Sequence, residues 1–178
     1  MKRYIALLRG INISGKNKIA MSELKQGFES LSYENVRTYL NSGNVVFSAD
    51  EDIPQIKEEI EAMIRDRFEL DIPVFVITVK EVRKILDHAP DWWGNEDKEI
   101  YDNLIFILPP YDAVQIHEEI GEPKEGLERI EEYGNVIFWS FSRKDYQKTN
   151  WWPRTAAVGT GSKMTIRTAN TVRKLADM

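Results

Sequence analysis

Residues 36–47, VRTYLNSGNVVF, contain two β-rich runs joined by the polar turn Asn41-Ser42-Gly43-Asn44. Glycine and asparagine tolerate the left-handed backbone that tight hairpin turns require. The segment therefore predicts a β-hairpin. A second stretch has the same form, because GNVIF at 134–138 matches GNVVF at 43–47. We interpret the match as an internal repeat, although Gly-Asn before β-branched residues is also a common way to build any hairpin.

The segments around the first hairpin have the periodicity of two strands and two helices. Apolar runs at 4–9 and 73–79 predict strands, and the stripe of apolar residues in 21–31 predicts a helix that Ser22 could cap. Residues 53–68 predict a longer amphipathic helix. The resulting order, β-α-β-β-α-β, is that of the ferredoxin-like fold.

The second half of the chain repeats this order less clearly. A helix at 80–88 and a loop lead to strands and helices predicted at 104–108, 113–120, 127–132, 136–141, 164–167 and 170–176, with a mixed segment at 143–158 that Pro153 interrupts. The fold class is therefore α+β, with two ferredoxin-like subdomains at 1–79 and 102–178 and a connection at 80–101. Strands 4–8, 74–79 and 104–108 are apolar on both faces, so we expect the subdomains to pack as one compact unit.

The composition excludes several classes of protein. The 178 residues include no cysteine, which rules out disulfides, thiol nucleophiles, zinc fingers and iron–sulfur ligation. No apolar run approaches the roughly 18 residues that cross a bilayer. The N-terminus runs into a strand and a polar loop, unlike a signal peptide. We therefore expect a soluble cytoplasmic protein that does not bind membranes.

Charge is unevenly distributed along the chain. Residues 1–47 carry seven basic and three acidic side chains. Residues 48–132 carry nine basic and 24 acidic side chains, and residues 133–178 carry eight basic and two acidic ones. Two basic ends thus flank an acidic middle, and they would form one basic surface if the fold brought them together. The net charge of −5 disfavours a protein dedicated to coating DNA.

The loop at 9–18, RGINISGKNK, is the first candidate site. It leaves a predicted central strand and leads into a helix, where backbone N–H groups and basic side chains suit an anion. Arg9 and Lys16 would supply charge, and Asn12 would orient the ligand. The spacing is not that of a P-loop. The alternative is a long connection anchored by Asn and Gly turns.

Two further groups are weaker candidates. Asn41, Ser42 and Asn44 could bind a ligand or could simply stabilise their own turn. Near the C-terminus, Arg167 lies with Asn170 and Thr171 around the start of the last predicted helix, which Thr168 could cap. Arg167 could join a basic surface or pair with the acidic middle of the chain.

Other residue types give little support for catalysis or for RNA binding. His88 and His117 have no partner at a metal-ligand spacing, so we predict no metal and no cofactor. The doublets Trp92-Trp93 and Trp151-Trp152 could stack on bases or sugars, but such residues more often close the edge of a core. The hairpin 41–47 lacks the repeated aromatic residues of the RNA-recognition module.

Three motifs resemble those of a bacterial family of proteins of unknown function, family 1697. They are LLRGINI at 7–13, TYLNSGNVVF at 38–47 and TIRTANTVRKL at 165–175. Ser14 stands where members usually have glycine, and Thr168 where they usually have asparagine. The resemblance implies two α+β subdomains in a bacterial cytoplasm and no established activity. The first loop is also similar in position to the phosphate-binding loop of acylphosphatase, although that consensus is not met.

The sequence thus favours a protein that binds a small anionic ligand, one that carries a phosphate group, through Arg9, Asn12, Lys16, Asn41, Ser42, Asn44 and Arg167. An acylphosphatase-like phosphoryl hydrolase, a single-stranded nucleic-acid binder and a protein interaction module are the alternatives. Nucleic acid is the less favoured partner. Nothing in the sequence indicates the oligomeric state.

Overall fold

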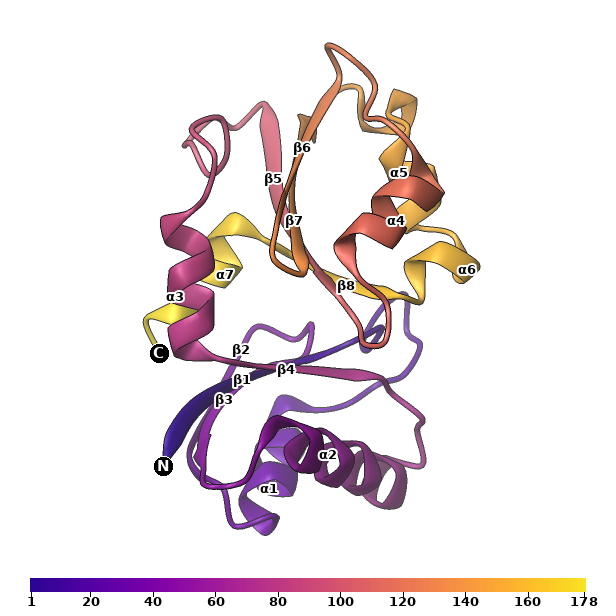
Figure 1. Ribbon diagram of the computed structural model, residues 1–178. Helices are drawn as coiled ribbons and strands as arrows, with labels where there is room; N and C mark the ends of the chain where they lie inside the picture. The colour runs from indigo at the N-terminus through magenta and orange to yellow at the C-terminus, as the bar shows by residue number, and fades with distance from the viewer. The chain divides into compact units, whose positions relative to one another are not determined.

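The chain forms two compact units in the computed structural model, which describes residues 1–157 and 159–178 (Figure 1). The first unit comprises residues 1–83 together with 175–178, and the second comprises residues 84–174. Each unit contains one four-stranded antiparallel sheet. No helix in the described part of the chain is both long enough and apolar enough to span a bilayer.

The first unit has the ferredoxin-like order of elements. These are β1 (Lys2–Leu8), α1 (Met21–Ser30), β2 (Glu34–Tyr39), β3 (Asn44–Ala49), α2 (Ile53–Phe68) and β4 (Val74–Thr78). The strand order in the sheet is β2-β3-β1-β4, and every neighbouring pair is antiparallel. The predicted hairpin at 36–47 is therefore confirmed as β2 and β3.

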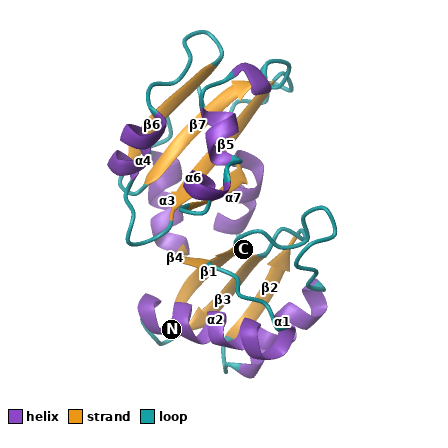
Figure 2. Cartoon of the chain, turned by 90° about the vertical axis from the view of Figure 1, so that its right-hand side faces the viewer, coloured by secondary structure: helices purple, strands orange, loops and turns teal.

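Helices α1 and α2 lie together on one face of the first sheet (Figure 2). Tyr4 and Phe47 point toward these helices, with ring centres 5.8 Å apart, and Phe28 of α1 lies 5.3 Å from Phe47. Asp52 caps α2 by accepting the Gln55 backbone N–H at 3.0 Å. The cap expected from Ser22 is wrong, because α1 begins at Met21 and no side chain caps it.

The second unit repeats the topology. Its elements are β5 (Ile100–Ile107), α4 (Ala113–Ile120), β6 (Glu128–Tyr133), β7 (Val136–Ser142), the 3-10 helix η1 (Tyr146–Lys148), α5 (Trp151–Thr155), α6 (Val158–Gly161) and β8 (Met164–Thr168). The strand order β6-β7-β5-β8 is that of the first sheet. Three short helical segments stand where the first unit has the single helix α2. The prediction of two ferredoxin-like subdomains in an α+β fold is thus confirmed.

Glu128 holds the start of α5 to the second sheet. This carboxylate is only 5% exposed and accepts hydrogen bonds from the backbone N–H groups of Lys124, Asn150 and Trp151 at 2.9, 2.5 and 3.3 Å. It also accepts the indole N–H of Trp139 at 3.1 Å. A buried carboxylate needs such donors, and these join β6, β7 and the start of α5.

Each sheet is followed at once by a helix, and the two helices share sequence. Helix α3 (Val79–Asp87) follows β4, and α7 (Ala169–Ala176) follows β8. Residues 78–87 read TVKEVRKILD, and residues 168–177 read TANTVRKLAD. The cap predicted for Thr168 is present, because its hydroxyl accepts the Thr171 N–H at 3.4 Å. The internal repeat therefore includes this final helix as well as the hairpins.

Candidate anion-binding sites

The loop after β1 is a small hairpin of its own. The Asn12 N–H donates to the Asn17 carbonyl at 3.1 Å, and the Lys16 N–H donates to the Ile13 carbonyl at 2.9 Å. Ser14 and Gly15 occupy the turn with φ angles of +50° and +75°. Two successive left-handed residues are typical of a type I′ turn, for which glycine is favoured. Ser14 therefore adopts the backbone conformation for which glycine is best suited.

Asparagine side chains hold this hairpin in place. The Asn12 amide donates both of its protons, to the Ile19 and Asn41 carbonyls at 3.0 and 2.8 Å, and its oxygen accepts the Ile19 N–H at 2.9 Å. The Asn17 amide donates to the Gly10 carbonyl at 2.9 Å. Both protons of the Asn12 amide are thus used by the backbone, so it positions the loop, while the exposed Lys16 carries charge to its surface.

The predicted turn at 41–44 lies beside this loop. Asn44 is fully buried and donates to the Tyr39 carbonyl at 2.9 Å and to the Ser42 hydroxyl at 2.8 Å. The Leu8 N–H donates to the Gly43 carbonyl at 2.8 Å. The structure thus brings Asn12 and Asn41 into contact, with Ser42 and Asn44 in the same turn. Whether these residues contact a ligand stays a prediction.

The two arginines of the predicted site lie in different units. Arg9 is half-buried at the end of β1, and burial lowers the pKa of its guanidinium. Arg167 lies in the second unit and is 8% exposed; its guanidinium donates to the Thr165 hydroxyl at 2.8 Å and to the Ile166 carbonyl at 2.9 Å. Burial lowers the pKa of Arg167 to about 10. Arg167 therefore has a buried role within its own strand.

A cavity of about 470 Å³ in the second unit has the features of an anion site that the sequence did not single out. It lies where the loop 94–98, the start of β5, and the junction of β8 with α7 come together. Its lining includes Lys98, Asp102, Arg143, Asn170 and Arg173. Basic side chains from three separate segments therefore face one space.

Aromatic rings hold both arginines of this cavity. The Arg143 guanidinium lies over the Tyr101 ring, 4.1 Å from its centre, and Arg173 lies over the Trp93 ring at 5.6 Å. Stacking on an aromatic face orients a guanidinium and leaves its N–H groups available. Within residues 1–157 and 159–178, no carboxylate lies within ion-pair distance of either arginine.

Gly94 fixes the position of Arg173. A Cβ atom on this glycine would collide with the Arg173 guanidinium, and the glycine φ is +79°. The neighbouring Trp93 is buried; its indole N–H donates to the Asn103 carbonyl at 2.7 Å, and its ring packs edge-on against Phe138 at 5.0 Å. The segment 93–94 thus forms a flat support for Arg173, and one tryptophan of the first doublet closes the core as expected.

A larger cavity of about 950 Å³ adjoins the first one. The two share Asn95, Asp97, Ile100 and Asp102 in their linings. The larger cavity is also lined by Trp92, Arg129 and Ser140. Ser140 is 5% exposed, and its hydroxyl donates a short hydrogen bond to the Asp102 carboxylate. Two acidic side chains, Asp97 and Asp102, therefore lie where the cavities meet.

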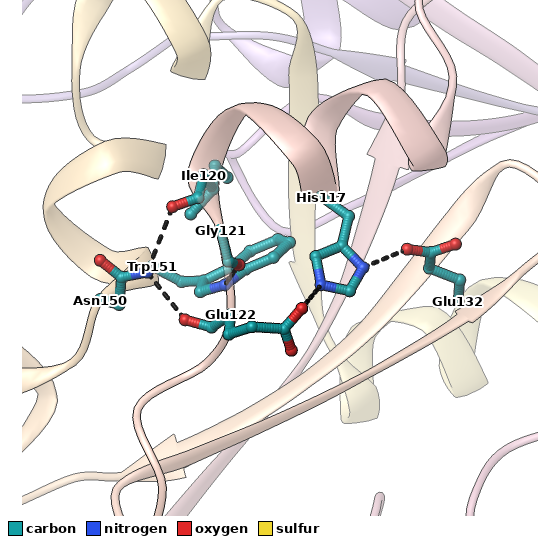
Figure 3. Close-up of polar contacts among 7 residues, drawn as sticks. All are labelled: His117, Ile120, Gly121, Glu122, Glu132, Asn150 and Trp151. Carbon is teal, nitrogen blue, oxygen red and sulfur yellow. Dashed lines mark hydrogen bonds and ion pairs between the residues drawn. The ribbon is translucent and has the colours of Figure 1, made fainter.

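His117 of α4 lies in a separate polar cluster, between Glu122 and Glu132 (Figure 3). Its ring nitrogens lie 2.5 Å from Glu132 and 3.2 Å from Glu122. Trp151 packs edge-on against the ring at 6.0 Å, and the Trp151 indole N–H donates to the Gly121 carbonyl at 3.1 Å. Among the residues that the structure describes, no group of three acidic or histidine side chains could hold a metal ion.

The aromatic residues of the two central strands of the first sheet, Tyr4 and Phe47, are not placed as in an RNA-recognition module. Tyr4 and Phe47, which lie on the two central strands, both pack beneath the helices, where Tyr33 stacks on Phe47 at 4.8 Å. The RNA-recognition module displays its aromatic residues on the open face of the sheet. The geometry of this unit therefore disfavours that mode of binding.

Comparison with known proteins identifies the family. The family model described as "Protein of unknown function (DUF1697)" matches residues 1–138. The chain belongs to the DUF1697 family. The DUF1697 match ends within β7, so Arg143 and Arg173 lie beyond it, as does the C-terminal motif at 165–175. No curated protein matches the chain.

One solved structure supports the fold over 99% of this DUF1697 chain. The chain is similar to the conserved bacterial protein SP0830 from Streptococcus pneumoniae, with 29% identity and a TM-score of 0.85. The similarity covers 99% of this chain and 97% of that one. An unknown protein from Galdieria sulphuraria shares 11% identity over 94% and 96% of the chains, with a TM-score of 0.28.

Proposed function

We propose that the protein binds a small ligand with an anionic group, such as a phosphate, in the 470 Å³ cavity of the second unit. The observation that carries the proposal is the pair of arginines, Arg143 and Arg173, each held on an aromatic ring and neither paired with a carboxylate among the described residues. The proposal includes a cytoplasmic location, with which the absence of cysteine is compatible.

The chemistry of the two side chains supports an oxyanion. A guanidinium presents a planar fork of N–H donors that matches two oxygens of a phosphate or carboxylate. Two such forks on one cavity can share a phosphate, which offers more than two acceptor oxygens. Lys98 adds a third positive charge to the wall, and the exposed Asn170 adds an amide. Arginine side chains that already stack on a ring also lose less rotamer entropy on binding than freely rotating ones.

The carboxylates of the same cavity set its polarity. Glu96, Asp97 and Asp102 also line the wall, so its charges balance overall. An anion is therefore attracted to the arginine end and repelled from the acidic end. This polarity favours a small ligand with one localised anionic group over a nucleic-acid strand, whose charges repeat along its length.

Isothermal titration with sodium phosphate, together with amide chemical shifts of the full chain, tests the proposal. We expect binding that shifts the Gly94 and Asn170 signals. Arg143→Gln and Arg173→Gln should each weaken it roughly 10- to 100-fold, the range for one lost charge-assisted hydrogen bond. Lys174→Gln removes one charge from the same helix but not from the cavity, and should change affinity less than threefold.

A second pair of variants separates this cavity from the loop of the first unit. Lys16→Gln and Arg9→Gln should leave phosphate affinity unchanged. If these variants abolish binding while Arg173→Gln does not, the cavity proposal is wrong and the loop predicted from sequence is the site. Steady turnover of acetyl phosphate lost in Arg9→Gln would instead support the hydrolase alternative.

A further inference from the structure

We infer that the ligand is a phosphorylated sugar or polyol, with its phosphate at Arg143 and Arg173 and its hydroxyl-bearing part in the adjoining 950 Å³ cavity. This inference rests on the proposed function and names the class of ligand. It follows from the fact that the two cavities adjoin and carry different chemistry.

The two cavities form one path for a ligand. Asn95, Asp97, Ile100 and Asp102 line both of them, whereas Arg143 and Arg173 line only the smaller one. A ligand anchored by the arginines therefore reaches the larger cavity past Asp97 and Asp102. Inorganic phosphate alone would leave the larger cavity unused.

Two of the four residues that line both cavities, Asp97 and Asp102, are carboxylates that accept hydrogen bonds. One oxygen of Asp102 accepts the hydroxyl proton of the buried Ser140, and one oxygen of Asp97 accepts the Glu99 N–H at 2.9 Å. Each carboxylate keeps further lone pairs for a donor. An ionised carboxylate can only accept hydrogen bonds, so it selects O–H or N–H groups and repels a second anionic group. Hydroxyl groups next to a phosphate satisfy both conditions.

The far wall suits the body of a sugar. Trp92 is half-buried and lines the larger cavity, and an indole can offer an apolar face to ring C–H groups. Arg129 adds donors for ring and hydroxyl oxygens on this wall, and Asn95 adds an amide donor from the wall that both cavities share. A wall of aromatic, carboxylate and amide groups is complementary to a ring that is apolar on its faces and polar at its rim.

Titrations of the full chain with three ligands test the inference: inorganic phosphate, glucose 6-phosphate and phosphoethanolamine. We expect glucose 6-phosphate to bind at least tenfold more tightly than either of the others. Phosphoethanolamine offers an ammonium group without hydroxyls, and equal or tighter binding of this ligand would overturn the assignment to a sugar or polyol.

Variants of the larger cavity complete the test. Trp92→Ala and Asp102→Asn should reduce the affinity for glucose 6-phosphate to that for phosphate. Phosphate affinity should be unchanged in Trp92→Ala and unchanged or tighter in Asp102→Asn, since the latter removes a negative charge from the wall. If Asp102→Asn does not fold, Trp92→Ala alone decides the outcome, because its indole is not part of the Ser140 hydrogen bond.

The two proposals fail in different ways. If wild-type protein binds no phosphate, or binds it equally well without Arg173, the proposed function itself is wrong. If phosphate binds through Arg173 but glucose 6-phosphate gains nothing over it, the anion site stands and the inference about the ligand class is overturned.

Discussion

The Arg83 guanidinium donates from Nε to the Ala176 carbonyl at 3.0 Å, at the C-terminal end of α7. In the repeated segments 78–87 and 168–177, Arg173 is the counterpart of Arg83. Among the described residues, Arg173 has no such bond to a helix end, and it lies instead over Trp93. The same position of the repeat thus stabilises a helix end in the first copy, as Arg83, and lines a cavity in the second copy, as Arg173.

The support that Gly94 gives to Arg173 can be tested with matched glycine variants. Gly94→Ala should weaken phosphate binding about tenfold, because the added methyl group displaces the guanidinium. Gly126→Ala is the control: its φ is +80°, close to the +79° of Gly94, but a Cβ there meets nothing within 4 Å. Both variants should lose about 1 kcal/mol of stability in chemical denaturation. Equal phosphate affinities in the two would contradict the role of Gly94.

Gly43 is expected to be the glycine most sensitive to substitution. A Cβ there would lie 2.7 Å from Cβ of Leu8 and 3.0 Å from Cδ1 of Ile11, at a φ of +89°. Gly43→Ala should therefore destabilise the protein by about 2–4 kcal/mol through strain and overpacking. Gly134→Ala, at the corresponding turn of the second hairpin, meets no atom within 4 Å and should lose only about 1 kcal/mol. Urea denaturation measures both.

The hairpins show how much of the fold can be predicted from local sequence. Gly-Asn turns act over a few residues, so both hairpins and the ferredoxin-like order follow from the pattern. The second crossover is different, because the start of α5 is held by the buried carboxylate of Glu128, a contact across more than 20 residues for Asn150. A glutamate in a charged run, ERIEE at 128–132, gives no sign of burial.

The candidate site was harder to predict than the fold. Asn12 was expected to face a ligand, yet both of its amide protons are used by the loop, because short polar side chains compete for nearby backbone groups. No local motif marks Arg143 or Arg173 as a binding residue. What distinguishes them is the aromatic ring beneath each one, and Tyr101 is 42 residues away from Arg143 in sequence. The one available signal was the Trp-Trp-Gly segment at 92–94.

Glu128→Gln should destabilise the protein by about 3 kcal/mol. The amide cannot accept the four N–H groups that the carboxylate binds, and it places its own NH₂ among donors. Glu131→Gln is the matched control, because Glu131 lies on the same strand but is exposed, and should change stability by no more than about 0.5 kcal/mol. Thermal unfolding of the two variants gives the comparison.

The Tyr33 hydroxyl should make the folding stability of the protein depend on pH. It donates to the Glu59 carboxylate at 2.5 Å, and burial together with this hydrogen bond raises its pKa above the ordinary value of 10. Above pH 10 the unfolded chain therefore loses this proton while the folded chain keeps it, so the stabilisation declines as pH rises. Tyr33→Phe should lower the free energy of unfolding by about 1–2 kcal/mol at pH 7. Between pH 9.5 and 11, the stability of this variant should decline less than that of the wild type. Parallel alkaline profiles would contradict this reading.

The two carboxylates beside His117 should differ in the energy with which each couples to its ring. The Glu132 contact is short and its side chain is 30% exposed, whereas Glu122 is 86% exposed. A double-mutant cycle between His117→Gln and Glu132→Gln should give a coupling of about 1 kcal/mol, and the cycle with Glu122→Gln no more than about 0.3 kcal/mol. A larger coupling to Glu122 would show that exposure does not determine the strength of these pairs.

The four donors of Glu128 have a consequence for how the second unit opens. The amides of Lys124, Asn150 and Trp151 and the Trp139 indole are all protected by one carboxylate, although they belong to distant segments. Separating α5 from the sheet breaks the Asn150 and Trp151 bonds together and leaves a buried charge short of donors. The Asn150 and Trp151 amide protons should therefore exchange with deuterium with a common free energy of opening, as one cooperative event rather than as independently fraying loops.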